Sequence, residues 1–112
     1  MLTLDALRAC GANTAEGLGR CMNNEAFYLR LVNMALDDAS FQKLSDAVAA
    51  GDKRAGFEAA HSLKGVLGNL ALTPIYAPVA EMTELLRAAV DADYQIYLDK
   101  ILAARDQMIA LR

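Results

Sequence analysis

The sequence predicts an all-α protein, an up-down antiparallel four-helix bundle with one or two short N-terminal helices packed against it. Three observations lead to this fold class. Apolar residues recur three and four positions apart in every long segment, which is the period of an amphipathic helix. No stretch of the 112 residues shows the alternating pattern of a strand. The links between the helical segments are short, so neighbouring helices should run antiparallel.

The N-terminal region is expected to form only short helices. Thr3 precedes the first of them, and Gly11 ends it. Asn13 or Thr14 caps a second short turn, because these side chains accept hydrogen bonds from the free N–H groups of a first helical turn. Glycines inside this turn keep it from extending far. Both helices should cover one end of the core.

Each longer helix begins at a residue that favours a helix start. Gly51 ends the second of these helices, and the third should end near Leu72. Pro78 has no N–H to donate, so residues 73–77 should form an irregular first turn before regular helix continues. The expected starts are Asn24, Ser40, Asp52, Thr73 with Pro74, and Asp91.

Composition indicates one domain, residues 1–112, and limits what it can do. Hydrophobic residues make up 55% of the chain, yet no apolar run approaches the roughly 20 residues that span a bilayer. With no leader sequence either, we expect a cytoplasmic protein without a membrane partner. The net charge of −3, with no cluster of Lys and Arg, argues against nucleic-acid binding. Cys10 and Cys21 lack metal-ligand spacing and should be reduced thiols. The start at Met1 and end at Arg112 favour a free-standing protein over a piece of a larger one.

The only histidine, His61, lies in the helix that Asp52 begins. On a helical wheel it is roughly 120° from the middle of the helix's apolar stripe, at the boundary with solvent. An imidazole that reaches water can act as a nucleophile, so we expect the chemistry of this protein at His61. The stripe consists of Phe57, Ala60, Leu63, Leu67 and Leu70.

Three residues that follow His61 complete the candidate site. Gly65 and Gly68 each cost a helix about 0.8–1.0 kcal/mol relative to alanine, so something else must favour them. On the histidine's side of the helix they leave a flat approach for another molecule. Lys64, three residues after His61, can bring an ammonium close to the imidazole. Together these residues predict a site that accepts an anionic group.

The chain resembles the histidine-containing phosphotransfer (HPt) domains. The signature is His61-x-x-Lys64-Gly65, preceded by Ala60 and followed by Gly68, Asn69 and Leu70. The similarity extends through Gly11-x-Asn13, Gly17-Leu18-x-Arg20-Cys21-Met22 and Phe27-Tyr28-x-x-Leu31, and so covers nearly the whole chain. One departure is Ala71, where the family often has glycine. We expect this change to affect mainly how the helix ends.

The resemblance implies a histidine phosphotransfer protein of a two-component phosphorelay. His61 would accept a phosphoryl group from a receiver aspartate or a kinase and pass it to another receiver. The implied partners are receiver domains of response regulators and a hybrid sensor histidine kinase, with the protein itself a monomer. It would be a phosphocarrier intermediate rather than a stand-alone catalyst, and would need no cofactor of its own because the receiver holds the divalent metal.

The resemblance also implies roles for the neighbouring residues. The distal nitrogen of His61 would react, and Lys64 would offset the phosphoryl charge. Thr83 falls where some relatives carry a glutamine or glutamate that orients the ring, and its side chain is shorter than either. Arg87, one turn later, would contact phosphate. The residues assigned to binding are Gly65, Gly68, Asn69, Thr83 and Arg87.

Two other interpretations fit parts of the sequence. Glu58-x-x-His61 has the spacing of half a di-iron site, but such a site needs two copies and the chain has one histidine. The alternative function is a non-phosphorylated helical module that binds a receiver or kinase domain. Loss of His61 or Lys64 would favour that alternative, and both are present.

Overall fold

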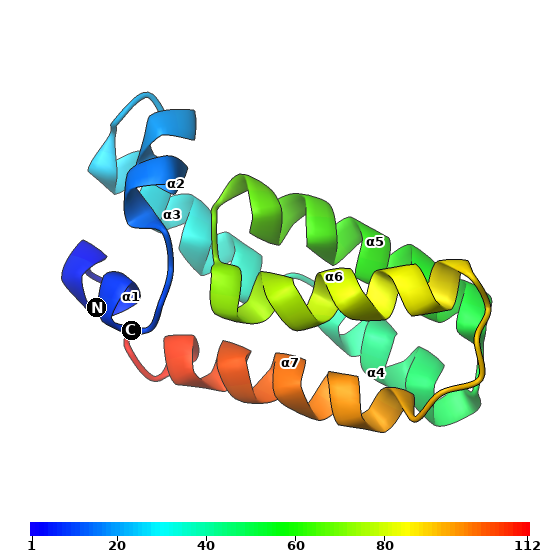
Figure 1. Ribbon diagram of the computed structural model, residues 1–112. Helices are drawn as coiled ribbons and strands as arrows, with labels where there is room; N and C mark the ends of the chain where they lie inside the picture. The colour runs from blue at the N-terminus through cyan, green and yellow to red at the C-terminus, as the bar shows by residue number, and fades with distance from the viewer.

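The computed structural model describes all residues from 1 to 112 and contains seven α-helices and no strand (Figure 1). Two are short and five are long, which confirms the predicted fold class. The short helices are α1 (Leu4–Ala9) and α2 (Thr14–Arg20). The long ones are α3 (Glu25–Leu36), α4 (Ser40–Ala50), α5 (Lys53–Asn69), α6 (Thr73–Arg87) and α7 (Tyr94–Ile109).

Helices α4 to α7 form an up-down bundle in which each helix packs against the next and α7 returns to α4. Figure 1 shows α3 leading into α4 along the same side of the bundle, with a break between them at residues 37–39. The molecule is elongated, 41 × 24 × 20 Å. None of the helices has both the length and the apolar character needed to cross a membrane.

A continuous apolar core runs through the bundle and extends beneath the short helices. Its fully buried side chains come from every long helix, and Leu7 adds a contribution from α1. No buried side-chain nitrogen or oxygen lacks a hydrogen-bond partner. The largest of the core side chains are Tyr28, Leu7, Leu36, Leu44, Leu63, Leu67, Leu72, Ile75, Met82 and Ile101.

The short helices cover one end of α5, as predicted. The Tyr28 hydroxyl donates to the Leu70 carbonyl (2.9 Å), and the Asn13 amide donates to the Ala71 carbonyl (3.0 Å). Gly17 packs so closely here that an added Cβ would lie 2.7 Å from the Leu70 carbonyl oxygen and would overlap the Tyr28 ring. Only glycine fits between α2 and these groups.

Four helix starts confirm the capping predictions. Thr3, Asn13, Asn24 and Asp52 each accept a hydrogen bond from an N–H of the first helical turn. Three predicted caps are wrong. Thr73 is the first residue of α6, and Leu72 precedes it with no side-chain capping bond. Ser40 lies inside α4, whose first turn is tied by the Asp38 carboxylate to the Ser40 N–H (2.8 Å), and Asp91 lies before α7, where it pairs with Lys53.

Helix α5 ends at Asn69, three residues earlier than predicted. The Ala71 backbone is left-handed (φ 55°), the Ala71 N–H donates to Gly68 and the Leu72 N–H donates to Leu67. This is a Schellman ending, in which glycine is the favoured residue at the left-handed position. The structure therefore explains why glycine is favoured at position 71, and Ala71 does lie at the helix end as expected.

Helix α6 is regular from Thr73 onward, so the predicted irregular turn at 73–77 is wrong. Pro74 lies in the first turn, where a missing N–H leaves no bond unmade. Pro78 removes one internal hydrogen bond. The helix persists because Ile75 and Val79, on either side of that gap, are both fully buried in the core.

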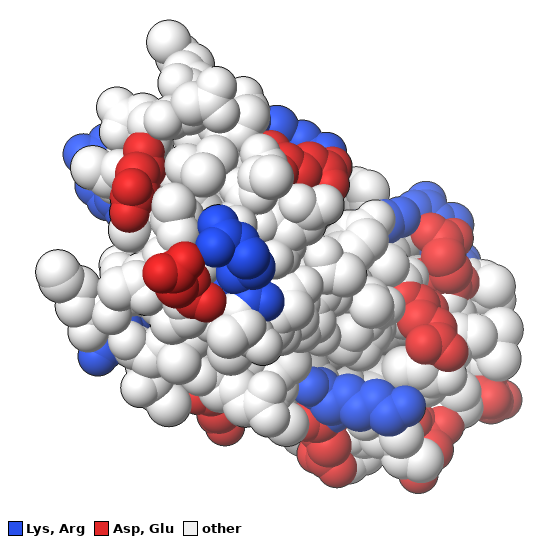
Figure 2. All heavy atoms as spheres, turned by 60° about the vertical axis from the view of Figure 1, so that its left-hand side comes forward, with Lys and Arg blue, Asp and Glu red and all other residues white.

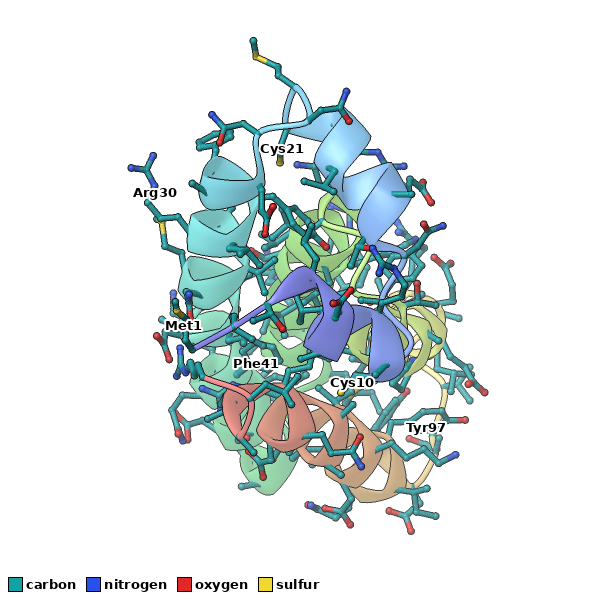
Figure 3. The ribbon with its side chains drawn as sticks, turned by 90° about the vertical axis from the view of Figure 1, so that its left-hand side faces the viewer. Met1, Cys10, Cys21, Arg30, Phe41 and Tyr97 are labelled. Atoms are coloured by element: carbon teal, nitrogen blue, oxygen red, sulfur yellow. The ribbon has the colours of Figure 1, made fainter.

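Neither the surface charges nor the two cysteines form a cluster. On the face shown in Figure 2, Lys and Arg lie beside Asp and Glu instead of gathering in a basic patch. Both cysteines are free thiols, and Figure 3 shows Cys10 and Cys21 well apart. Arg30 of α3, in contrast, points outward from the bundle in the same view.

Candidate functional site

His61 lies in the middle of α5 with its side chain exposed to solvent. Its ring stacks on the ring of Phe57, one turn earlier, with centroids 5.5 Å apart and planes 17° apart. Phe57 was predicted to face the core, but it is only half-buried and lies at the edge of the apolar stripe. The imidazole is therefore supported on one face and open to an approaching molecule.

A charged cluster joins α5 to α6 beside this stack. The Lys64 ammonium is 3.4 Å from the Glu84 carboxylate, which also accepts from Arg87 Nε at 3.3 Å. The Arg87 guanidinium in turn lies over the Phe57 ring, 4.9 Å from its centroid. The hydrogen bond from Lys64, followed by the charge of Arg87, lowers the pKa of the Glu84 carboxyl, so Glu84 is ionised at neutral pH.

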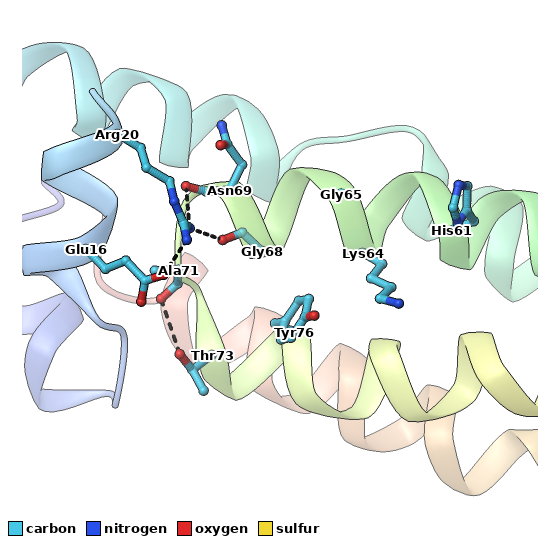
Figure 4. Close-up of a pocket in the computed structure, with 10 residues that line it drawn as sticks. All are labelled: Glu16, Arg20, His61, Lys64, Gly65, Gly68, Asn69, Ala71, Thr73 and Tyr76. Carbon is cyan, nitrogen blue, oxygen red and sulfur yellow. Dashed lines mark hydrogen bonds and ion pairs between the residues drawn. The ribbon is translucent and has the colours of Figure 1, made fainter. Parts of the chain in front are cut away.

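An open groove of about 670 Å³ runs from His61 toward the C-terminal end of α5 (Figure 4). Polar residues dominate its lining, which suits a charged group better than an apolar ligand. Three sequence-predicted residues, Gly65, Gly68 and Asn69, line it together with His61 and Lys64. The remaining lining residues are Glu16, Arg20, Ala71, Thr73 and Tyr76.

The two glycines of the site differ in their surroundings. A Cβ added at Gly65 would have no neighbour within 4 Å, whereas one at Gly68 would lie 3.0 Å from the Tyr76 ring. Gly65 also borders a second groove of about 580 Å³ between α3 and α5, where Leu31 and Met34 face it. Gly65 thus leaves open surface on α5, and Gly68 provides room for Tyr76 of α6.

Arg20 of α2 is a groove residue that sequence reasoning did not single out. Its guanidinium donates to the carbonyls of Gly68 (2.6 Å) and Asn69 (3.2 Å) and pairs with Glu16. A cation at this position adds hydrogen bonds to carbonyls at the negative end of the α5 dipole. Arg20 belongs to the segment Gly17-Leu18-x-Arg20-Cys21-Met22, which resembles the N-terminal half of HPt domains. That resemblance was the one feature of the sequence that pointed to Arg20.

Thr83 and Arg87 are placed differently from the expectation. Thr83 is fully buried and its hydroxyl donates to the Val79 carbonyl at 2.7 Å, so it does not face the groove and is not available to orient the His61 ring. Arg87 is exposed, and its guanidinium contacts the Phe57 ring, which in turn stacks on the His61 ring. No group of three or more His, Cys, Asp or Glu side chains is arranged to hold a metal ion.

The fold and site define a helical bundle that presents one exposed histidine beside a lysine and a glycine on its central helix. The family model for the Hpt domain matches residues 30–112, and the chain belongs to this family. Hpt domains are phosphotransfer modules of two-component signalling and interact with receiver domains and kinases. No curated protein and no solved structure matches the chain. Residues 1–29, which carry α1 and α2, lie outside the family match.

Proposed function

We propose that this protein is a phosphorelay intermediate that accepts a phosphoryl group on His61 from a receiver aspartate or a kinase and passes it to another receiver. The observation that carries the proposal is the exposed His61 ring, at the edge of an open groove, in a chain that belongs to the Hpt family. Neither a buried histidine nor one enclosed by its own chain could meet a second protein's aspartyl phosphate.

The transfer step requires few groups from this chain. The distal nitrogen of His61 attacks the phosphorus of the partner's aspartyl phosphate. As the N–P bond forms, the P–O bond to the aspartyl group breaks, and the aspartate leaves as a free carboxylate. Phosphoryl transfer depends mainly on in-line positioning and charge neutralisation. In this proposal the receiver and its own divalent metal supply most of that neutralisation, and the bundle has no cofactor.

Lys64 and Gly65 serve the same step from one turn beyond His61. Lys64 offsets the phosphoryl charge, because its stem lies on the groove side of α5. Gly65, with no neighbour near its missing Cβ, lets the receiver backbone approach the helix closely. The apolar groove on the other side of Gly65 offers Met34, which is 63% exposed, as a contact for the docked receiver.

The test is phosphorylation by a receiver domain charged from acetyl phosphate. We expect the wild-type chain to gain acid-labile, base-stable phosphate, the signature of phosphohistidine, and His61→Gln to gain none. The exposed side chain makes no core contact, so the variant should keep its helical circular dichroism. Labelling of His61→Gln would contradict the assignment. Receiver binding by a wild-type chain that stays unlabelled would instead favour the interaction module.

A further inference from the structure

Glu84 lies between the two cations of the site, and the proposed transfer step does not use it. Its Oε1 is 3.4 Å from Lys64 on α5, and its Oε2 is 3.3 Å from Arg87 on its own helix. The Lys64 side chain is the more buried partner, 31% exposed against 58% for Glu84. Figure 4 shows Lys64 extending from α5 toward α6 rather than toward the His61 ring.

The lysine that follows the acceptor by three residues is therefore already paired in the unphosphorylated protein. A phosphoryl group on His61 carries a charge of about −1.5 to −2 at neutral pH, larger than that of one carboxylate. It would draw the flexible lysine toward the imidazole. Glu84 would still be paired with Arg87, so the exchange leaves no charge without a partner.

We propose that Glu84 is a positioning residue that holds Lys64 before transfer and competes with the phosphoryl group for it afterwards. Glu84 makes and breaks no covalent bond. Its effect is on the equilibrium, because each transfer to His61 must separate Lys64 from this carboxylate. Glu84 thus favours return of the phosphoryl group to a receiver. The inference rests on the proposed function of His61.

The first experiment measures the fraction of phosphorylated chain at equilibrium with a receiver domain charged from acetyl phosphate. We expect Glu84→Gln to raise the ratio of phosphorylated to unphosphorylated chain about two- to fivefold, the scale of an exposed ion pair. Glu81→Gln is the matched control, because Glu81 is on the same helix but its carboxylate accepts from Tyr97 of α7 (3.4 Å). It should leave the ratio unchanged.

A double variant tests whether the effect passes through Lys64. In the Lys64→Ala background, Glu84→Gln should leave the ratio unchanged, since no ammonium remains to compete for. A shift of the same size in both backgrounds would overturn the proposal. So would a Glu84→Gln ratio equal to or below that of the wild type.

The second experiment does not depend on a receiver. The chain is phosphorylated chemically with phosphoramidate, and the Glu84 carboxyl is titrated by NMR with and without phosphate on His61. Because the hydrogen bond from Lys64 is the main cause of the lowered pKa of Glu84, we expect that pKa to rise when His61 is phosphorylated. An unchanged pKa would overturn the proposal. Because the phosphoryl charge also raises this pKa by direct repulsion, a rise of the same size in Lys64→Ala would overturn the proposal as well. A rise that requires Lys64, in a chain that no receiver labels, would support the lysine exchange while contradicting the proposed function.

Discussion

The orientation of the His61 ring depends on stacking rather than on a polar neighbour from α6. Phe57 supports one face of the imidazole, and the Arg87 guanidinium covers the Phe57 ring. Such cation–π contacts contribute about 0.5–1 kcal/mol at exposed sites, enough to favour one ring arrangement without locking it. The Thr83 hydroxyl is buried and donates to the Val79 carbonyl, so the ring of Phe57, and not Thr83, orients the imidazole.

At Lys64 the expected effect is on rate and not on the possibility of transfer. Lys64→Ala should slow phosphorylation of His61 by a receiver roughly tenfold or more, the loss of one contact to a charged group. Lys43, an exposed lysine on α4, gives the control substitution Lys43→Ala. Rapid-quench measurement of both variants checks this prediction. Equal rates would reduce Lys64 to a surface lysine.

The two glycines of the site should respond oppositely to the same substitution. Gly65→Gln adds a good helix former in open space, so it should raise the free energy of unfolding by several tenths of a kcal/mol and slow transfer by obstructing the receiver. Gly68→Gln forces a side chain against the Tyr76 ring and should lower that free energy by about 1 kcal/mol.

Denaturant midpoints and transfer rates on the same samples separate these effects. The background variant Tyr76→Ala removes the neighbour of Gly68, so Gly68→Gln should no longer destabilise the fold there. If Gly68→Gln is as stabilising as Gly65→Gln in the wild-type background, the packing role of Gly68 is refuted and both glycines serve the partner.

At the scale of elements, α2 is the piece that fixes the end of α5. Gly17→Ala should lower the free energy of unfolding by about 1–3 kcal/mol, because the new methyl meets a backbone carbonyl that cannot move aside easily. Gly19 is in the same helix with nothing within 4 Å of its missing Cβ, so Gly19→Ala should stabilise the protein by about 0.8–1.0 kcal/mol. Urea unfolding of both variants checks the pair. A Gly17→Ala variant as stable as the wild type would show that α2 is free to move away from Leu70.

Helix starts show what local sequence predicts and where it fails. Asn24 and Asp52 cap as expected, because an N-cap bond involves only residues three positions apart. Ser40 and Asp91 are equally good capping residues, but neither caps its helix: a carboxylate two residues away replaces Ser40, and a tertiary ion pair engages Asp91. The Asp38 carboxylate accepts a hydrogen bond from the Ser40 N–H at the start of α4. The Asp91 carboxylate pairs with Lys53, 38 residues away.

In the whole molecule, some residues of the site are predicted by local sequence and others are brought there only by the packing of helices. His61, Lys64 and Gly65 lie within one helical turn and a half, so their helix and spacing predicted them as a group. Glu84 and Arg20 reach the site from other helices, 20 and 48 residues away along the chain. No periodicity within α5 contains that information, because only the packing of α2 and α6 on α5 brings them there.

The C-terminal end of α7 closes the molecule onto α3, as Figure 1 shows by the return of the chain to its first helices. Arg112 makes two hydrogen bonds to the Asp37 carboxylate (2.7 and 2.8 Å), across 75 residues, and Arg105 donates to the Leu36 carbonyl (2.7 Å). The bonds from Arg112 lower the pKa of Asp37. Both contacts hold the point where α3 ends before α4.

This closure should make stability depend on pH in a defined direction. A carboxyl whose pKa is lower in the folded protein stabilises it above the pKa of the unfolded chain, and this contribution disappears as the pH falls through the folded value. Arg112→Gln should therefore unfold at lower denaturant than the wild type at pH 7, and the two midpoints should converge as the pH falls and Asp37 becomes protonated. Arg54→Gln removes an exposed pair within α5, 3.7 Å from Glu58, and should change the midpoint little at any pH. A difference between Arg112→Gln and wild type that stays constant after Asp37 has become protonated would mean that Arg112 acts through packing of its stem, because a contribution from the ion pair must vanish with the charge on Asp37.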